Sequence, residues 1–145
     1  MGERTFTFSA LLRAPRAVLP ALDEGDVLLR RRNHGDLMLS TRARAESRDE
    51  ALALMSRMLM RLLSQDGRMA VRVLAHELPW LHWLPEASRL ACVREILRDL
   101  AAGAERGLPM RFLASVEAWR ATAEAWSDPD FAREIQGRPP MRHDV

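Results

Sequence analysis

Apolar and polar residues alternate at the start of the chain and then recur at helical spacing. Residues 4–9, RTFTFS, predict a short strand with Phe6 and Phe8 on one face. Ser9 is the expected N-cap of a helix that ends near Gly25, with apolar positions at Leu11, Leu12, Val18, Leu19 and Leu22. Pro15 fits an early turn of this helix, whereas a proline at position 20 should kink or shorten it.

Two short apolar runs around a polar tip predict a β-hairpin. Strands 27–31 and 36–41 flank the tip Arg32-Asn33-His34-Gly35. The sequence SRDE that follows has the form of a capping box, with Ser47 as N-cap and Glu50 three residues later. It predicts a helix that ends before Gly67 and has one apolar face, made of Leu52, Met55, Leu59, Leu62 and Leu63.

The second half of the chain has only helical patterns. RMAVRVLAHEL predicts a short helix stopped by Pro79, and LPWLHWLPEA predicts a turn. Longer helices are expected from about Pro85 to Ala104 and from near Pro109 to near Trp126.

The last predicted helix, in SDPDFAREIQG, has a start and a stop signal. Asp128 is the expected N-cap, Pro129 the first helical residue and Gly137 the stop, and RPPMRHDV is expected to be a frayed tail. The order strand–helix–strand–strand–helix, followed by helices, predicts an α+β protein. We expect a first domain at 1–66, a helical region at 67–137 and a flexible tail at 138–145.

Composition places this pattern in a globular protein. The chain has 145 residues, of which 48% are hydrophobic and 29% charged, as in soluble domains. No apolar run is long enough to cross a bilayer and the start lacks the features of a signal peptide, so a cytoplasmic protein without membrane contact is expected. All basic residues are arginine, and residues 1–48 hold nine arginines against six acids, a net charge of +3 around the hairpin.

The sequence gives little reason to expect catalysis. Cys92 is alone in an apolar helical stretch, which favours a buried small side chain over a nucleophile. In HELPWLH a zinc-protease motif would need a second histidine four residues after His76, but that residue is Trp80, and Pro79 would break the helix. We therefore predict no enzyme, no metal site and no cofactor.

The arginine run at positions 30–32 has two interpretations. Phosphate groups of a nucleic acid would neutralise Arg30, Arg31 and Arg32 and accept hydrogen bonds from their guanidinium groups. Alternatively, these arginines form ion pairs on a solvated surface with nearby acids, namely Asp23, Glu24, Asp26 and Asp36.

Several of these segments together resemble the prevent-host-death (Phd/YefM) antitoxins. The resemblance covers roughly residues 4–63 and is carried by Phe8-Ser9, the apolar helix, LDEGDV at 22–27, LRRR at 29–32, the glycine turn and LML at 37–39. Residues 115–137 also resemble helical tails found behind such domains in some bacterial proteins.

The resemblance implies a fold, partners and site residues. Such proteins dimerise through the N-terminal unit, bind operator DNA in their own promoter and block a cognate toxin with the C-terminal segment. Arg30, Arg31 and Arg32 fall on strand-end positions that meet DNA. The usual first-helix arginine falls on Leu12, with Arg13 beside it, and the usual asparagine falls on Ala14, followed by a proline.

The tryptophans of the helical region are the candidate toxin-binding residues. Trp80, Trp83, Trp119 and Trp126 could fill pockets on a partner, or could form the core of a small helical domain. Because residues 68–137 have their own caps and apolar periodicity, we expect either a pre-folded helical domain or helices that dock on a dimer mate.

The sequence thus predicts an antitoxin that acts as a homodimer or higher homo-oligomer, with operator DNA and a toxin as partners. Two alternatives remain open. One is a stand-alone DNA-binding regulator whose helices oligomerise or sense a ligand. The other is a helical adaptor with no role on DNA.

Overall fold

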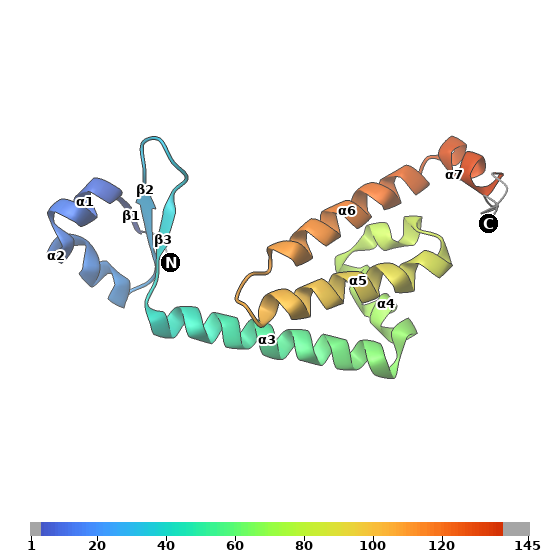
Figure 1. Ribbon diagram of the computed structural model, residues 1–145, viewed down its shortest axis with the longest axis horizontal. Coiled ribbons are helices and arrows are strands. Elements are labelled where there is room, and N and C mark those ends of the chain that lie inside the picture. The colour runs from blue at the N-terminus through green and yellow to red at the C-terminus, as the bar shows by residue number, and fades with distance from the viewer. Residues whose placement is uncertain (1–3, 138–145) are drawn as a thin grey trace, which may run out of the picture. The chain divides into compact units, whose positions relative to one another are not determined.

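The computed structural model describes residues 4–137 and is α+β, mostly helical with one small sheet (Figure 1). The chain divides into two compact units, Met1–Glu50 and Ala51–Val145. This division falls inside helix α3 (Arg42–Gln65), earlier than the boundary expected after residue 66, because apolar residues in the C-terminal half of α3 pack on the helical core. The expected tail at 138–145 lies outside the described residues.

The N-terminal unit contains a three-stranded sheet with the strand order β1-β2-β3. β1 pairs with β2 in parallel, and β2 pairs with β3 in an antiparallel hairpin. A parallel pair requires a crossover, which is here a run of short helices. The elements in chain order are β1 (Arg4–Thr7), α1 (Phe8–Arg13), α2 (Pro15–Val18), the 3₁₀ helix η1 (Leu19–Asp23), β2 (Val27–Arg30) and β3 (Leu37–Leu39).

A small hydrophobic core holds these short helices against one face of the sheet. Val18 and Ala21 from the crossover meet Val27 and Leu29 of β2, and all four are buried. Around them pack half-buried apolar residues: Phe6, Phe8, Ala10, Leu11, Leu22 and Leu39. Alternation along β2 therefore sends Leu28 and Arg30 to the face without helices.

The first predicted helix begins earlier than expected and is divided into three short pieces, α1, α2 and η1. Thr7, not Ser9, is the N-cap, since its Oγ1 accepts a hydrogen bond from the Ala10 amide at 3.1 Å, and Phe8 is the first helical residue rather than the last of the strand. The helix breaks at Ala14, whose φ and ψ are −141° and 64°. The proline at position 15 explains the break, because a residue that precedes proline is disfavoured in the α-helical region.

The capping box predicted at Ser47 and Glu50 is wrong. Both residues lie inside α3, which begins at Arg42. Thr41 provides the cap instead, because its Oγ1 accepts a hydrogen bond from the Arg44 amide at 3.4 Å. Thr41 follows directly after the hairpin and offers the same capping chemistry as Ser47, so the helix starts there.

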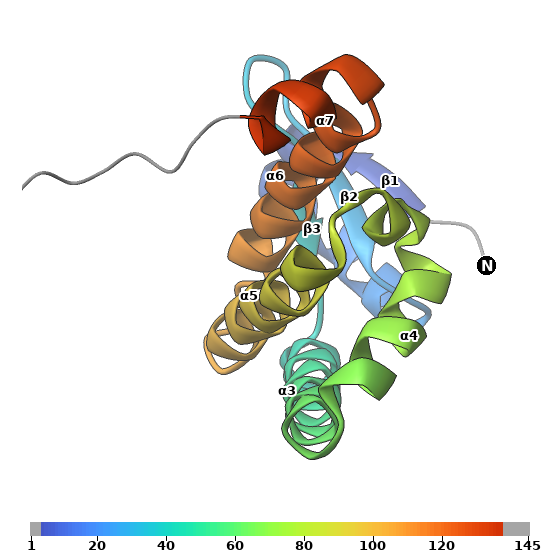
Figure 2. The ribbon, with the colours of Figure 1, turned by 90° about the vertical axis from the view of Figure 1, so that its right-hand side faces the viewer.

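The helical unit consists of the C-terminal half of α3 and the elements that follow. α5 and α6 are joined by residues 105–109 and run antiparallel side by side (Figures 1 and 2). Buried Leu81, Leu84, Ile96 and Leu97 are among the residues that form their core. The elements are α4 (Gly67–Glu77), the 3₁₀ helix η2 (Pro79–Trp83), α5 (Glu86–Ala104), α6 (Met110–Trp126) and α7 (Pro129–Gln136).

Helix bounds in this unit follow the predicted caps and stops. Asp128 caps α7, with its Oδ1 accepting from the Asp130 amide at 2.9 Å, and Pro129 occupies the first position. Gly137 is the C-cap of the same helix. Among residues 4–137, no helix is both long and apolar enough to span a bilayer.

Candidate nucleic-acid interface

The β2–β3 hairpin places the arginine run at one end of the sheet. Arg30 is the last residue of β2, is exposed, and pairs in register with Thr7, the N-cap of α1. Arg31 and Arg32 lie in the connection between β2 and β3. Both strands are shorter than predicted, so the connection extends from residue 31 to residue 36.

Arg31 closes this connection and therefore differs from its two neighbours. Its backbone N–H donates to Asp36 Oδ1 at 3.2 Å, and its side-chain Nε–H donates to the Gly35 carbonyl oxygen at 2.6 Å. Arg31 is half-buried, whereas Arg32 is exposed. The tip is thus held by Arg31, and the guanidinium groups that face solvent freely are those of Arg30 and Arg32.

Two of the four acids near the hairpin, Glu24 and Asp26, form ion pairs with arginines outside it. Glu24 forms an ion pair with Arg4, and Asp26 pairs with Arg44 at 2.7 Å and with Arg48 at 2.8 Å. Asp36 accepts a hydrogen bond from a backbone amide. Within the described residues, the guanidinium groups at positions 30–32 form no ion pair, so the predicted pairing of these arginines with nearby acids is not observed.

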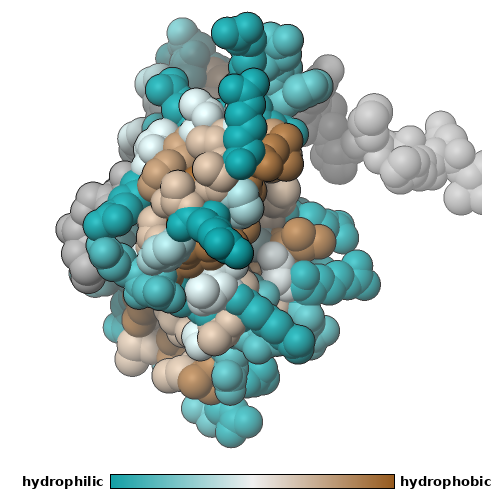
Figure 3. Space-filling view, turned by 90° about the vertical axis from the view of Figure 1, so that its left-hand side faces the viewer, coloured by the Kyte–Doolittle hydropathy of each residue, from teal (hydrophilic) through white to brown (hydrophobic). Residues whose placement is uncertain are grey.

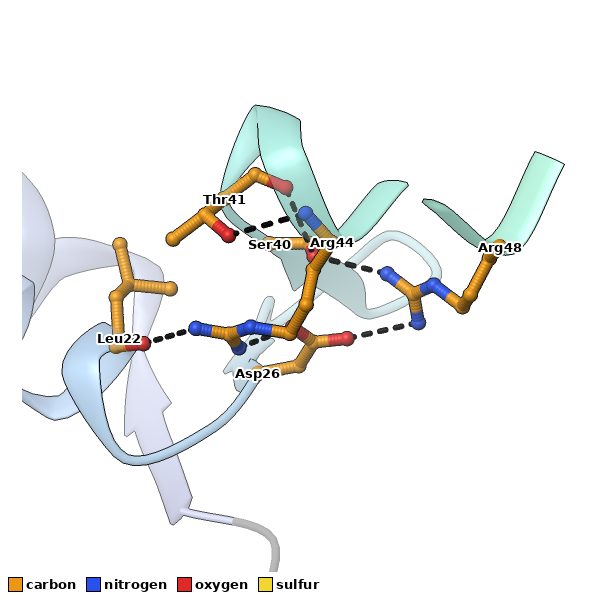
Figure 4. A network of polar contacts seen from close by, with 6 residues as sticks. All are labelled: Leu22, Asp26, Ser40, Thr41, Arg44 and Arg48. Carbon is orange, nitrogen blue, oxygen red and sulfur yellow. Dashed lines mark hydrogen bonds and ion pairs between the residues drawn. The ribbon is translucent and has the colours of Figure 1, made fainter. Parts of the chain in front are cut away.

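Asp26 is the centre of a polar network at the base of the hairpin (Figure 4). Arg48 donates to Asp26 Oδ2 and to the Ser40 hydroxyl, the latter at 2.8 Å. Arg44 donates to Asp26 Oδ1 and to the Leu22 carbonyl oxygen. The Ser40 hydroxyl and the two guanidinium groups lower the pKa of the Asp26 carboxyl below its ordinary value of 3.8.

This network fixes both ends of the hairpin to the first turns of α3. Leu22 and Asp26 precede β2, and Ser40 follows β3. Arg44 and Arg48 are four residues apart on one face of the helix. The network is not predictable from a helix that starts at Ser47, because Arg44 then lies outside the helix. If the helix is started at Arg42, the four-residue spacing of Arg44 and Arg48 places both arginines on one face and indicates the network.

Arg13, the remaining predicted DNA contact, is separated from the hairpin arginines by the length of α1. It is the last residue of that helix and is exposed, whereas Arg30 lies beside the helix start. Six residues of α-helix span about 9 Å. Leu12, at the position where the resemblance expects an arginine, is exposed, and the face around α1 and α2 carries hydrophobic as well as hydrophilic side chains (Figure 3).

The predicted partner-binding tryptophans differ in exposure. Trp80 is 8% exposed and belongs to the helical core, so its side chain is not available to a partner. Trp119 and Trp126 are half-buried against the same core. The Trp119 indole N–H donates to Glu95 at 3.1 Å, and the ring of Trp126 packs edge-to-face on Phe131 at 6.1 Å. Only Trp83, at 50% exposure, faces solvent substantially.

An open pocket lies between the first turns of α4 and α5. Its volume is about 950 Å³, and charged residues line much of it: Asp66, Arg68, Arg72, Glu86 and Arg89. Arg89 is held in place by the carbonyl oxygens of Leu84 and His82, at 3.0 and 3.1 Å. Val71, Ala87 and Leu90 are apolar parts of the lining.

No arrangement for metal or thiol chemistry is found in the part of the chain that the structure describes. Residues 4–137 contain no group of three or more His, Cys, Asp or Glu side chains placed to bind a metal ion. Cys92 is buried in the helical core, and burial together with the charge of Glu95 raises the pKa of its thiol to about 12. A thiolate nucleophile is therefore disfavoured at neutral pH.

The fold and the site thus define an α+β protein whose arginine-bearing hairpin is joined to a helical unit. Comparison with protein-family models, curated proteins and solved structures found no match for this chain.

Proposed function

We propose that this protein is the antitoxin of a toxin–antitoxin pair. As a homodimer in the cytoplasm it binds operator DNA in its own promoter with the β2–β3 hairpin, and its helical unit binds and blocks a toxin. The observation that carries the DNA-binding part is that, within the described residues, no acid forms an ion pair with Arg30 or Arg32. Glu24 and Asp26 are bound to Arg4, Arg44 and Arg48, and this leaves the hairpin arginines at positions 30 and 32 for phosphate groups.

In this proposal the arginines of the hairpin have different roles. Arg30 and Arg32 supply the contacts, and Arg31 holds the tip that carries Arg32. Arg13 lies at the far end of α1, about 9 Å along the helix axis, where it reaches a different phosphate group of the same duplex. Unpaired guanidinium groups bind phosphates with release of counterions, so the affinity depends on salt.

Fluorescence anisotropy with the DNA upstream of the coding sequence tests this part. Wild-type protein is titrated at two salt concentrations on that duplex and on a scrambled duplex of equal composition. We expect preference for the upstream DNA. The double variant Arg30→Ala/Arg32→Ala should bind more weakly. The number of counterions released on binding should also fall, by about one for each phosphate contact that the variant lacks.

The matched control is Arg94→Ala/Arg98→Ala, which removes the same charge from exposed positions of α5. It should bind like the wild type. Equal affinity for both duplexes, or equal weakening in the two double variants, would show that the hairpin arginines are not the operator contact.

The toxin-binding part is tested in cells. The gene beside the coding sequence is expressed from an inducible promoter, with and without this protein. An antitoxin restores growth that the neighbouring gene arrests, and the Arg30→Ala/Arg32→Ala variant should restore it equally, since the helical unit is unchanged. A neighbouring gene that causes no arrest, or an arrest that this protein leaves unrelieved, would contradict the antitoxin proposal.

A second candidate function is a stand-alone DNA-binding regulator that senses a small ligand. The pocket between α4 and α5 favours it, because arginine side chains and apolar residues line a cavity of about 950 Å³. This regulator shares the DNA-binding result and differs in the growth assay, in which it has no toxin to neutralise.

A further inference from the structure

The pocket between α4 and α5 lies within the helical unit and carries an excess of positive charge. Its lining includes three arginines, Arg68, Arg72 and Arg89, and two acids, Asp66 and Glu86. Three arginines against two acids give the lining a net charge of +1. Within the described residues none of these five side chains forms an ion pair, either with one another or with other groups. The pocket therefore keeps its charge.

Two of these side chains are held by the local backbone. Arg89 is half-buried, and its Nε and Nη2 groups donate to the carbonyl oxygens of Leu84 and His82 at 3.0 and 3.1 Å. The carbonyl groups orient the guanidinium group but leave its charge without a counter-ion, which is costly for a half-buried cation. Asp66 is the N-cap of α4 and accepts a hydrogen bond from the Met69 amide at 2.9 Å, so its carboxylate already has a partner.

The other two arginines are exposed side chains of α4. Arg68 and Arg72 are four residues apart, which places them on one face of the helix. Two neighbouring guanidinium groups repel each other, and each matches the paired oxygens of a carboxylate or a similar anionic group. No side chain caps the start of α5, whose first turn also lines the pocket, so its amide groups add to the positive potential.

The apolar part of the lining favours an organic anion over an inorganic one. Val71, Ala87 and Leu90 line the pocket together with Gly67. A Cβ atom at Gly67 would lie 2.9 Å from Leu90 Cδ1, so the first turns of α4 and α5 approach closely at this point. The volume of about 950 Å³ is typical of sites for drug-sized molecules and exceeds what an inorganic anion fills.

We propose that this pocket binds a small organic acid, a molecule with one anionic group, such as a carboxylate, and an apolar body. The anionic group meets Arg68 and Arg72, and the apolar body lies on Val71 and Leu90. The net charge of the lining selects a single negative charge, since its two acids would repel a polyphosphate. The site goes beyond the antitoxin proposal. It deepens the second candidate function, on which it rests only for the purpose of the ligand.

Fluorescence titration of the full-length protein with 8-anilinonaphthalene-1-sulfonate tests the site. This probe has the required chemistry, because it joins one sulfonate to an apolar ring system, and its fluorescence rises when it leaves water. N-phenyl-1-naphthylamine has the same rings without the sulfonate and is the matched neutral probe. We expect saturable binding of the sulfonate probe to the wild type.

The variant Arg68→Gln/Arg72→Gln removes both charges and keeps the side chains polar. It should bind the sulfonate probe at least about tenfold more weakly, because charge-assisted hydrogen bonds are lost. The affinity for the neutral probe should stay the same. The control Arg94→Gln/Arg98→Gln removes the same charge from exposed positions of α5 outside the lining and should leave both affinities unchanged.

The variant Glu86→Gln should have the opposite effect, which a folding defect cannot imitate. Glu86 is exposed in the first turn of α5, and its replacement removes negative charge from the lining. We expect the sulfonate probe to bind about two- to threefold more tightly and the neutral probe to bind equally. Equal or weaker binding of the sulfonate probe would contradict recognition of an anion in this pocket.

Competition shows which part of the ligand is recognised. Sodium decanoate, used below its micelle-forming concentration, is a carboxylate with an apolar chain and should displace the sulfonate probe. Inorganic phosphate at matched ionic strength should not, because it lacks the apolar body. Displacement by phosphate and not by decanoate would mean a site for an inorganic anion and would overturn the proposal.

Three further results would also overturn it. They are no saturable binding of the sulfonate probe, equal weakening in Arg68→Gln/Arg72→Gln and Arg94→Gln/Arg98→Gln, and equal loss of both probes in the first of these variants. The titrations contain neither DNA nor toxin. Failure here is therefore distinguishable from failure of the proposed operator binding or toxin neutralisation.

Discussion

At the scale of single residues, the three consecutive arginines of the hairpin differ in what their side chains contact. Arg31 donates hydrogen bonds that close the tip of the hairpin, whereas Arg30 and Arg32 leave their guanidinium groups in solvent. Replacing Arg31 would therefore disturb the conformation of the tip as well as its charge. Replacing Arg32 removes charge alone, which is why the DNA-binding test uses positions 30 and 32.

Glycine positions also differ from one another. Gly103 is buried near the end of α5, and a Cβ atom there would lie 2.5 Å from the Leu108 carbonyl oxygen. The backbone of the α5–α6 connection must shift to admit it. We expect Gly103→Ala to lower the free energy of unfolding by about 1–3 kcal/mol, the usual range for overpacking. Urea unfolding followed by circular dichroism measures the change.

Gly25→Ala is the matched control for this prediction. A Cβ atom at Gly25 has no neighbour within 4 Å, and Gly107, with φ of 63°, is the only residue of the described chain with a positive φ. We expect the free energy of unfolding to change by less than about 0.5 kcal/mol. Equal destabilisation by the two substitutions would mean that the close approach at Gly103 is relaxed easily.

At the scale of elements, the Asp26 network decides how the hairpin is held. Arg44 and Arg48 reach from one face of α3 to residues on both sides of the hairpin. The hairpin base and the helix start are therefore coupled through one carboxylate. A change at Asp26 should affect the whole base of the hairpin, not a single contact.

The charge of Asp26 makes this contribution depend on pH. Because the folded-state pKa is lowered from 3.8, the stabilisation is present above the pKa of the unfolded chain and is lost as the pH falls through the folded value. We expect Asp26→Asn to have a lower urea midpoint than the wild type at pH 7. The two midpoints should converge as the pH falls below about 4.

Asp23→Asn is the control for the pH experiment. Asp23 lies close by in sequence, is exposed, and forms no ion pair within residues 4–137. Its midpoint should follow that of the wild type across the pH range. If the difference in urea midpoint between Asp26→Asn and the wild type persists unchanged at low pH, the charge of Asp26 is not the source of the stabilisation.

At the scale of the whole molecule, the two units differ in the size of their cores. Four buried residues form the core of the N-terminal unit, and ten form the core of the helical unit. Small cores give marginal stability. We therefore expect hydrogen exchange by mass spectrometry to show faster exchange for the amides of β1–β3 than for those of α5 and α6.

Association should change this exchange pattern. A second copy or an operator duplex that binds only the folded N-terminal unit stabilises it by mass action. Protection of β1–β3 is then expected to rise with protein concentration and on addition of operator DNA. Equal protection of both units at every concentration would indicate that the chain unfolds as one cooperative unit.

Several elements could be predicted from the sequence because local chemistry determines them. Asp128, Pro129 and Gly137 bound α7 through contacts within one or two turns, and Pro79 stops α4 through its own ring. The hairpin follows from two apolar runs around a polar tip. The α+β class follows from the order of these elements, as does the extended helical region.

Other features depended on residues that lie far apart along the chain, and only the tertiary structure decided them. The start of α3 could be placed at Thr41 or at Ser47, since both offer a capping hydroxyl. Arginines of both the hairpin and α3 were candidate ion-pair partners for Asp26, and in the folded chain it pairs with Arg44 and Arg48.

The same holds for exposure. Trp80 and Trp83 have the same local pattern, yet one is in the core and the other is half exposed. The sequence by itself determined where most helices and strands lie, because caps, prolines and apolar periodicity act over a few residues. The tertiary structure decided which arginines remain without carboxylate partners and which tryptophan is buried, because both depend on which elements pack against each other.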